Sequence, residues 1–120
     1  MAFQLTKTTK RVGKVTIVTQ PDLNKPHVTR QDSFDAEFEV VDQETYEQID
    51  ADVTEGNLSP KEVVEKYFIG VKTDLLDLDK NPIEFSAAKA FMLTQSNYIT
   101  AIYNAWSHMQ LGVKQKNSKK

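Results

Sequence analysis

The sequence predicts an α+β fold, in which a small N-terminal antiparallel β-sheet or hairpin is followed by three to four helices packed on it. Three observations predict this class. β-branched and alternating apolar runs fill the first third, apolar residues at helical spacing fill the last third, and caps or turns separate the segments. A chain of 120 residues has room for one core, so we expect a single domain over residues 1–120, with residues 1–13 and 116–120 as flexible ends.

Two strands are predicted near the start of the chain. Residues 14–19 are β-branched at five of six positions, and residues 34–41 alternate between apolar and acidic side chains. The Pro-bounded segment 21–26 between them reads as a loop, and residues 27–30 resume an extended conformation. Residues 1–13 either stay disordered or add an edge strand. The alternation predicts an antiparallel sheet with one buried face.

Helix signals begin in the middle of the chain. Asp42 can cap a short helix, after which residues 50–57 are acidic and contain a glycine, so we expect a loop there. Ser59 and Glu62 form a capping box around Pro60, which predicts a second helix. The following run, residues 67–71, fits the end of this helix or a buried strand equally well, because periodicity cannot decide over five residues.

The last third predicts a turn and two helices. Residues 77–82 have turn chemistry, Ser86 caps a short helix through Leu93, and Ser96 caps a longer helix to about Gln115. The longer helix has one apolar stripe at helical spacing. Its members are Tyr98, Ala101, Ile102, Ala105, Trp106, Met109 and Val113.

This stripe has two interpretations. It could bind an amphipathic helix of a partner, or it could be the core of the domain itself. We favour the core for Ile102 and Trp106, because a small domain cannot easily leave its single Trp outside the core. The predicted core residues are Phe34, Phe38, Phe85, Ile102 and Trp106.

The charges are segregated along the chain. Residues 1–31 hold six bases and one acid, residues 32–84 hold sixteen acids and four bases, and residues 85–120 hold five bases and no acid. Opposed blocks of this kind attract one another within a monomer, or they set head-to-tail contacts between copies. We favour the first arrangement and keep the second open.

Composition also bears on the compartment. The chain has no cysteine, so disulfides, thiolate metal sites and a cysteine nucleophile are excluded, which fits a reducing compartment. Residues 1–7 lack the apolar core of a signal peptide, and no stretch approaches the ~20 apolar residues that a membrane helix needs. We expect a soluble, cytoplasmic protein.

No motif in the sequence predicts catalysis. His27 and His108 lie far apart, and neither a Gly-x-Ser-x-Gly elbow nor a Gly-rich phosphate loop is present. We expect no enzyme, no catalytic residue and no cofactor. Nucleic-acid binding stays open as an alternative, because the ends are basic and Tyr103 or Trp106 could stack on bases.

One acidic segment partly matches a calcium loop. Asp77, Asp79 and Asn81 have the spacing of the first three ligands in an EF-hand. The glycine required next is Pro82, and the carboxylate required at the twelfth position is Ala88. We therefore expect a solvated turn and no metal site.

Four segments in fixed order resemble the tail assembly chaperones of long-tailed, siphovirus-type bacteriophages. They are the strand-to-cap segment 34–42, the aromatic-x-Gly-Val segment 68–71, the turn segment 77–86 and the helix 98–105. No single segment is diagnostic, and the resemblance rests on their order and spacing over roughly residues 34–117. Ser and Asn stand at positions 96 and 97, where the family often has Leu or Ile before the aromatic residue.

The resemblance implies a non-enzymatic assembly factor. Such a chaperone binds the phage tape-measure protein, helps recruit tail-tube subunits around it, acts in the host cytoplasm and is absent from the mature virion. Many members have a longer form made by a programmed ribosomal frameshift, and Lys119 and Lys120 fit an adenine-rich slippery codon pair. The alternatives are a structural tail completion or terminator protein of the virion, and a small nucleic-acid-binding regulator.

Candidate contact residues follow from the stripe and the charge blocks. An outward-facing part of the stripe, the basic C-terminal end and the acidic middle of the chain are the surfaces on which a partner or a second copy would bind. The candidates are Tyr98, Met109, Lys114, Lys116, Asp74, Asp77 and Asp79.

Overall fold

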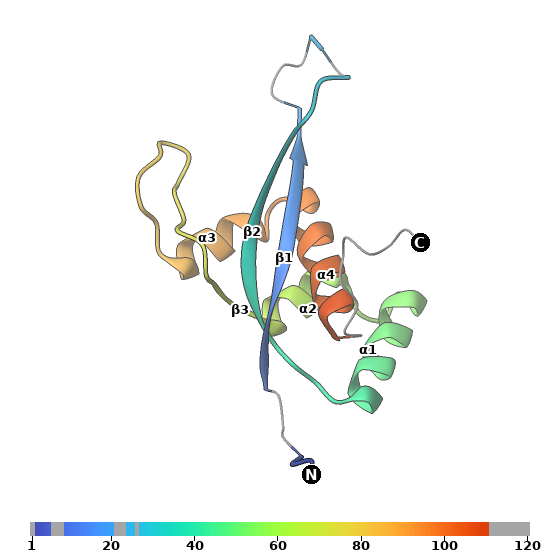
Figure 1. The fold of residues 1–120 in the computed structure, drawn as a ribbon. Helices are drawn as coiled ribbons and strands as arrows, with labels where there is room; N and C mark the ends of the chain where they lie inside the picture. Colours follow the sequence, from blue (N-terminus) through green and yellow to red (C-terminus); the bar gives the residue numbers. More distant parts are fainter. Residues whose placement is uncertain (1, 6–8, 21–23, 26, 111–120) are drawn as a thin grey trace.

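The computed structural model describes residues 2–5, 9–20, 24–25 and 27–110. It confirms the α+β class, with a three-stranded antiparallel sheet that begins with the N-terminal hairpin and four helices packed on it (Figure 1). The elements in chain order are β1 (Lys10–Thr19), β2 (Arg30–Glu39), α1 (Gln43–Glu55), α2 (Pro60–Tyr67), β3 (Phe68–Val71), α3 (Phe85–Met92) and α4 (Ser96–Gln110).

The sheet has the order β1-β2-β3, and β1 and β2 form a long hairpin. Lys10 lies opposite Glu39 and Thr19 opposite Arg30, so all ten residues of each strand are paired. β3 pairs only with the base of β2, from Ala36 to Phe38, and a register shift interrupts this pairing after Glu37. The outer half of the hairpin therefore extends beyond the helices, as Figure 1 shows.

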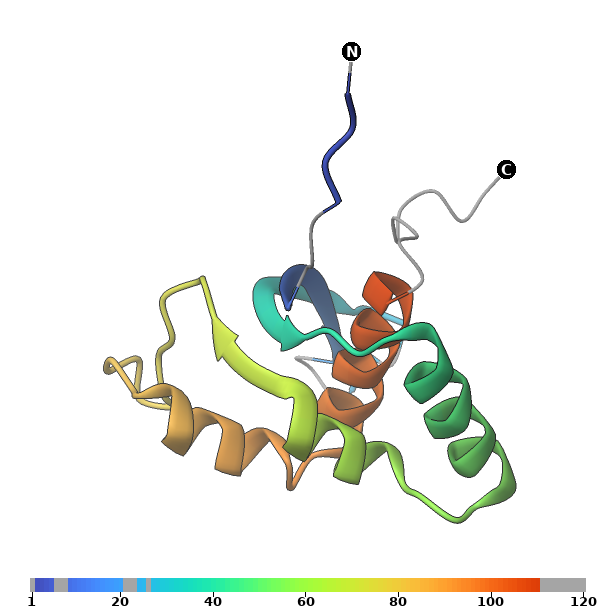
Figure 2. The ribbon, with the colours of Figure 1, turned by 90° about the horizontal axis from the view of Figure 1, so that it is seen from below.

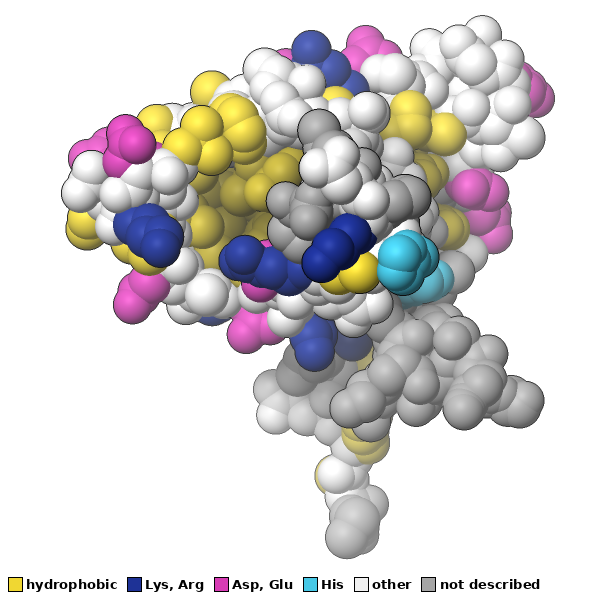
Figure 3. All heavy atoms as spheres, turned by 90° about the horizontal axis from the view of Figure 1, so that it is seen from above, with side chains coloured by type: hydrophobic (Ala, Val, Ile, Leu, Met, Phe, Trp, Pro, Cys, Tyr) yellow, Lys and Arg dark blue, Asp and Glu magenta, His cyan; other side chains and the backbone are white. Residues whose placement is uncertain are grey.

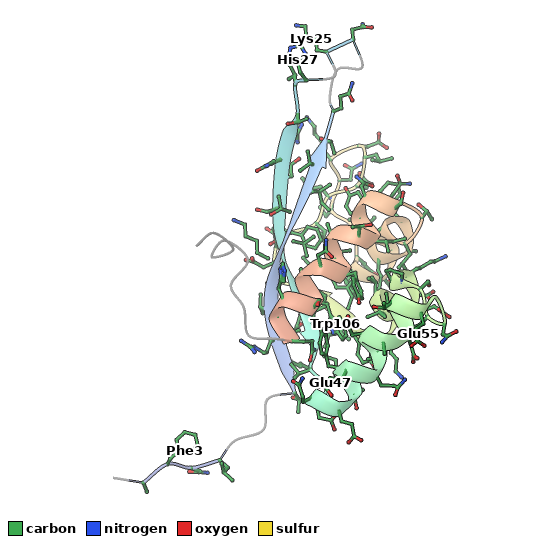
Figure 4. All side chains as sticks on the ribbon, turned by 90° about the vertical axis from the view of Figure 1, so that its right-hand side faces the viewer. Phe3, Lys25, His27, Glu47, Glu55 and Trp106 are labelled. Carbon is green, nitrogen blue, oxygen red and sulfur yellow. The ribbon has the colours of Figure 1, made fainter. Side chains whose placement is uncertain are left out.

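The helices cover one face of the sheet (Figure 4), and α4 lies between the strands and α1 (Figure 2). Alternation places Val15 and Ala36 on the covered face, where both are fully buried. A Cβ at Gly13 would lie 3.2 Å from the Phe38 ring, closer than an ordinary contact, so the glycine leaves room for this ring of β2 under α4. The core thus lies between the hairpin and α4.

The predicted core residues lie on that side of the sheet. Phe38, Ile102 and Trp106 are buried, while Phe34 and Phe85 are half-buried and pack against the core. Rings link these elements, since the Phe68 ring lies 5.9 Å from that of Phe38 and 5.1 Å from that of Phe85.

Several predicted boundaries are wrong, and both strands begin four residues earlier than expected, at Lys10 and Arg30. The loop expected over residues 50–57 is the second half of α1, which continues to Glu55 and ends at Gly56 with φ of 84°. Its apolar face continues through Val53, so the acids of the segment simply occupy the solvent face. Ser86 is not a cap, because α3 already begins at Phe85 with Glu84 at the N-cap position. Ser96 is not a cap either, because it is the first residue of α4 and the first helical bond of Ile99 goes to the Gln95 carbonyl.

The open choice over residues 67–71 is resolved as a helix end followed by a strand. α2 ends at Tyr67, and Phe68–Val71 form β3 beside β2. A strand therefore follows the first two helices, which the order of strands first and helices second did not predict. The capping box at Ser59 is confirmed in both directions, with its hydroxyl accepting from the Glu62 N–H and its own N–H donating to the Glu62 carboxylate.

The uncovered face of the sheet pairs basic with acidic residues. Lys10 lies opposite Glu39, and Lys14 lies opposite Asp35. Lys72, which directly follows β3, has its Nζ 3.8 Å from the Glu37 carboxylate. The basic block at the start of the chain thus lies along part of the acidic block.

Candidate partner-binding groove

An apolar groove lies between the segment joining β3 to α3 and the two C-terminal helices. Its volume is about 360 Å³, and Figure 3 shows hydrophobic side chains gathered in a hollow on this side of the molecule. Three of its apolar side chains are well exposed: Leu78 at 85%, Leu76 at 59% and Phe91 at 40%. The full lining is Leu75, Leu76, Asp77, Leu78, Asp79, Ile83, Ala88, Phe91, Met92 and Tyr98.

A hydrogen-bonded turn holds one wall of the groove. The Asp77 carboxylate accepts from the backbone N–H groups of Asp79 and Asn81, at 2.9 Å each, and Lys80 has a positive φ of 67°. An isolated bridge from Leu76 to Pro82 closes the base of the turn. The leucines of the turn are thus held beside the groove by backbone bonds.

The opposite wall is the corner between α3 and α4. The ring of Phe91 meets that of Tyr98 edge to face at 6.1 Å, which places one aromatic side chain from each helix in the groove. The Thr94 hydroxyl and N–H both donate to the Phe91 carbonyl, at 2.6 and 2.9 Å, and stabilise the corner. Buried Met92 and Ala88 form the floor.

The polar residues at the groove are acids. Asp77 and Asp79 line it, and exposed Asp74 immediately precedes the lining residue Leu75. Apolar walls with an acidic margin suit an apolar peptide segment that carries basic residues. In the described ranges (2–5, 9–20, 24–25 and 27–110), no group of three or more His, Asp or Glu side chains is placed to hold a metal ion.

The predicted contact residues separate into three sets. Tyr98, Asp77 and Asp79 come together at the groove, with Asp74 beside it. Met109 is not on a contact surface: it is buried, because the C-terminal half of α4 lies against β1. Lys114 and Lys116 lie outside the described residues.

Sequence reasoning missed the leucines of the groove. Leu76, Leu78 and Phe91 supply its most exposed apolar surface, although residues 77–82 were interpreted only as a solvated turn. The available signal was the presence of three leucines among residues 75–79, since a turn that contacts only water does not need them.

Two side chains near the core have shifted pKa values. Burial lowers the pKa of Lys89, and the nearby Glu65 charge offsets part of this effect. Its ammonium donates to the backbone carbonyls of Glu65 and Phe68, at 2.8 and 2.7 Å, and so joins α3 to the end of α2. Burial, with smaller effects of Asp50 and Tyr46, raises the pKa of Tyr103. Both groups lie outside the groove lining.

Comparison of the chain with protein-family models, curated proteins and solved structures found no match. Among the described residues, no helix is long and apolar enough to cross a membrane.

Proposed function

We propose that this chain is a non-enzymatic phage tail assembly chaperone that binds the tape-measure protein in the apolar groove and helps recruit tail-tube subunits. The observation that carries the proposal is the groove itself, with its exposed leucines, aromatic corner and acidic margin. The resemblance of residues 34–117 to tail assembly chaperones supplies the identity of the partner. Host cytoplasm as the place of action and absence from the finished virion follow from the same proposal.

The chemistry of the groove suits an amphipathic helix of the partner. Helix-in-groove recognition buries apolar anchors at helical spacing, and a long coiled tape measure offers many such segments. Full burial of one Leu or Phe side chain from water contributes about 1.5–3 kcal/mol. Because Leu76 and Phe91 are already partly buried, the three side chains supply only part of the about 8 kcal/mol of a micromolar affinity, and the rest must come from other contacts along the groove. Release remains possible at that strength, which a chaperone requires.

Self-association belongs to the same proposal. The charge blocks of the chain are only partly paired within the sheet, and acids Asp74, Asp77 and Asp79 stand at the groove margin. A second copy can therefore meet this margin through its basic ends. The partners are the tape-measure protein, the tail-tube protein and other copies of this chain.

The first test is co-expression with the tape-measure protein of the same phage. Tape-measure protein should stay soluble and co-purify with the wild-type chain, whereas the double variant Leu76→Ser/Leu78→Ser should retain at least about tenfold less of it. Both leucines are more than half exposed, so their replacement should leave the fold intact. Val18→Ser/Val28→Ser is the matched control, because these two valines are exposed on the hairpin, away from the groove.

Equal capture by the groove variant and its control would contradict the proposed site. Mass spectrometry of purified virions tests the class of protein separately: a chaperone should be missing, and stoichiometric presence would favour a tail completion or terminator protein. The longer form is tested at the gene, where the codons of Lys119 and Lys120 should overlap a slippery heptamer.

A further inference from the structure

The N-terminal segment presents apolar side chains to solvent. Phe3 is 86% exposed and Leu5 is 84% exposed, and they are among the most exposed large apolar residues of the described chain. In an extended conformation, as a docked peptide adopts, their spacing of two residues places both side chains on the same side. We call residues 2–5 the N-terminal arm. Two bare apolar side chains at this spacing are the pattern of a peptide that docks in a groove.

The groove offers a complementary surface. Its exposed leucines and its aromatic corner can take two apolar anchors, and its margin holds Asp77 and Asp79. Three bases follow the arm along the chain: Lys7, Lys10 and Arg11. The two surfaces therefore match in both respects, apolar against apolar and basic against acidic.

We propose that the N-terminal arm of one copy occupies the apolar groove of a second copy, with Phe3 and Leu5 against Leu76, Leu78 and Phe91. The groove is then covered until the tape-measure segment displaces the arm. Only the identity of this displacing partner rests on the proposed function. The contact between arm and groove is a property of the chain alone.

The fold separates the two surfaces. The arm precedes β1, at whose foot the Thr9 carbonyl accepts from the Val40 N–H at 2.9 Å. The groove is lined by α3 and the segment before it, and α3 lies to one side of the hairpin (Figure 1). An arm and a groove on different surfaces make a heterologous contact, in which each copy donates one arm and accepts another. Reciprocal exchange closes a dimer, and one-way exchange extends a chain.

The bases next to the arm add a salt-sensitive component. Lys10 is exposed at the start of β1, and Arg11 donates to the Met109 carbonyl at 3.2 Å, which keeps its charge near the foot of the hairpin. When the arm is seated, this basic end faces the acidic margin around Asp79. Opposite charges at such exposed positions raise the rate of encounter and fix the orientation of the arm.

The experiment uses the full chain without any partner. Sedimentation velocity over a range of concentrations should show self-association of the wild type, and Phe3→Ser/Leu5→Ser and Leu76→Ser/Leu78→Ser should each weaken it at least about tenfold. The control variant Val18→Ser/Val28→Ser loses as many exposed apolar side chains outside both surfaces and should associate as the wild type does.

Mixing the arm variant with the groove variant distinguishes the arm–groove contact from other interfaces between copies. The arm variant keeps an intact groove and the groove variant keeps an intact arm, so an equimolar mixture should regain association through one intact contact. Circular dichroism checks that each variant is folded before mixing. Wild-type chain that remains monomeric at all concentrations, association unaffected by the arm variant, or a mixture as weakly associated as its components would each overturn the proposal.

A final measurement distinguishes this inference from the proposed function. If tape-measure protein binds in the groove, adding it should dissociate the self-associated wild type, and the arm variant should bind it at least as tightly as the wild type. Self-association through the arm and the groove, without any tape-measure binding, would contradict the proposed binding of the tape-measure protein and leave the arm–groove contact standing. Tape-measure binding by a chain that never self-associates would overturn the arm–groove contact, together with the self-association in the proposed function, and would leave tape-measure binding in place.

Discussion

Trp106 is the largest fully buried side chain among the described residues. It is 1% exposed and stacks on Tyr67 at 5.5 Å between centroids, with the Tyr46 ring 5.6 Å away. These contacts join α4 to α2 and α1 in a single aromatic cluster. Removing the indole therefore opens a cavity among three helices.

Trp106→Ala should lower the free energy of unfolding by about 3–5 kcal/mol, the cost of emptying a buried aromatic site. Urea denaturation followed by circular dichroism measures the change. Trp106→Phe serves as a milder variant that stays folded if the alanine variant does not, and its loss should be smaller. Unchanged urea midpoints for both variants would show that Trp106 does not contribute to the core.

Tyr103 gives the domain a dependence on alkaline pH. Burial holds the pKa of its phenol above the ordinary value of 10.0. The unfolded chain then loses this proton at lower pH than the folded chain does, so the folded state binds more protons between those two pKa values. Its stabilising effect is fully present below pH 10.0 and is lost as the pH rises through the folded pKa.

Tyr103→Phe should therefore reduce the loss of stability above pH 10, while leaving the slope between pH 7 and pH 9 unchanged. Urea midpoints measured across this range compare the variant with the wild type. Parallel curves above pH 10 would contradict the shifted pKa of this phenol.

The apolar stripe of α4 illustrates what single residues in the sequence can predict. Helical spacing correctly groups Tyr98, Trp106 and Met109 on one side of the helix, because spacing is a local property. Yet Met109 is buried against β1 while Tyr98 lines the groove. The difference arises because the first turn of α4 meets α3 while its C-terminal half lies against β1, and this long-range placement leaves no trace in the periodicity.

Among the elements, α2 is specified most fully by its own residues. Ser59, Pro60 and Glu62 occupy the N-cap, first and third positions, and their reciprocal hydrogen bonds form as the sequence predicts. Such a box depends on four consecutive residues only. Because all its bonds are local, the box can be predicted from the sequence, and its removal should destabilise only the start of α2.

Ser59→Ala should lower the free energy of unfolding by about 1 kcal/mol, because the Glu62 N–H loses its acceptor in the first turn. Thermal or urea unfolding measures this loss. Thr54→Ala is a suitable control, since it is an exposed hydroxyl residue inside α1 and caps no helix. A loss of the same size in the control would show that a cap is not the cause.

β3 and the groove are elements that the sequence leaves undetermined. Five residues from Tyr67 fit a helix or a strand, and only pairing with the distant residues 36–38 of β2 makes them a strand. Likewise, Asp77 predicts a turn because an Asx turn is local. That the turn forms the wall of a groove depends on α3 and α4, which follow it by several residues and fold back toward it.

Over the whole molecule, the segregation of charge is only partly relieved by folding. The hairpin sets Lys10 and Lys14 opposite Glu39 and Asp35, on the uncovered face of the sheet. The acids at the groove margin, Asp77 and Asp79, have their basic counterpart in the bases that follow the arm of a second copy in the proposed arrangement. Folding and association should therefore respond differently to salt.

Raising NaCl from about 50 mM to about 500 mM shortens the screening length from over 10 Å to under 5 Å, which weakens contacts between exposed charges. The folded monomer should barely respond, by less than about 1 kcal/mol, because exposed pairs across the hairpin contribute little to its stability. Self-association should weaken severalfold over the same range, since its apolar anchors persist while its charge attraction is screened. Urea midpoints of Leu76→Ser/Leu78→Ser, which should be monomeric, measure the first quantity, and sedimentation of the wild type measures the second. An oligomer indifferent to salt would restrict the contact to Phe3 and Leu5, whereas one that dissociates completely would show that charge, and not the apolar arm, holds the copies together.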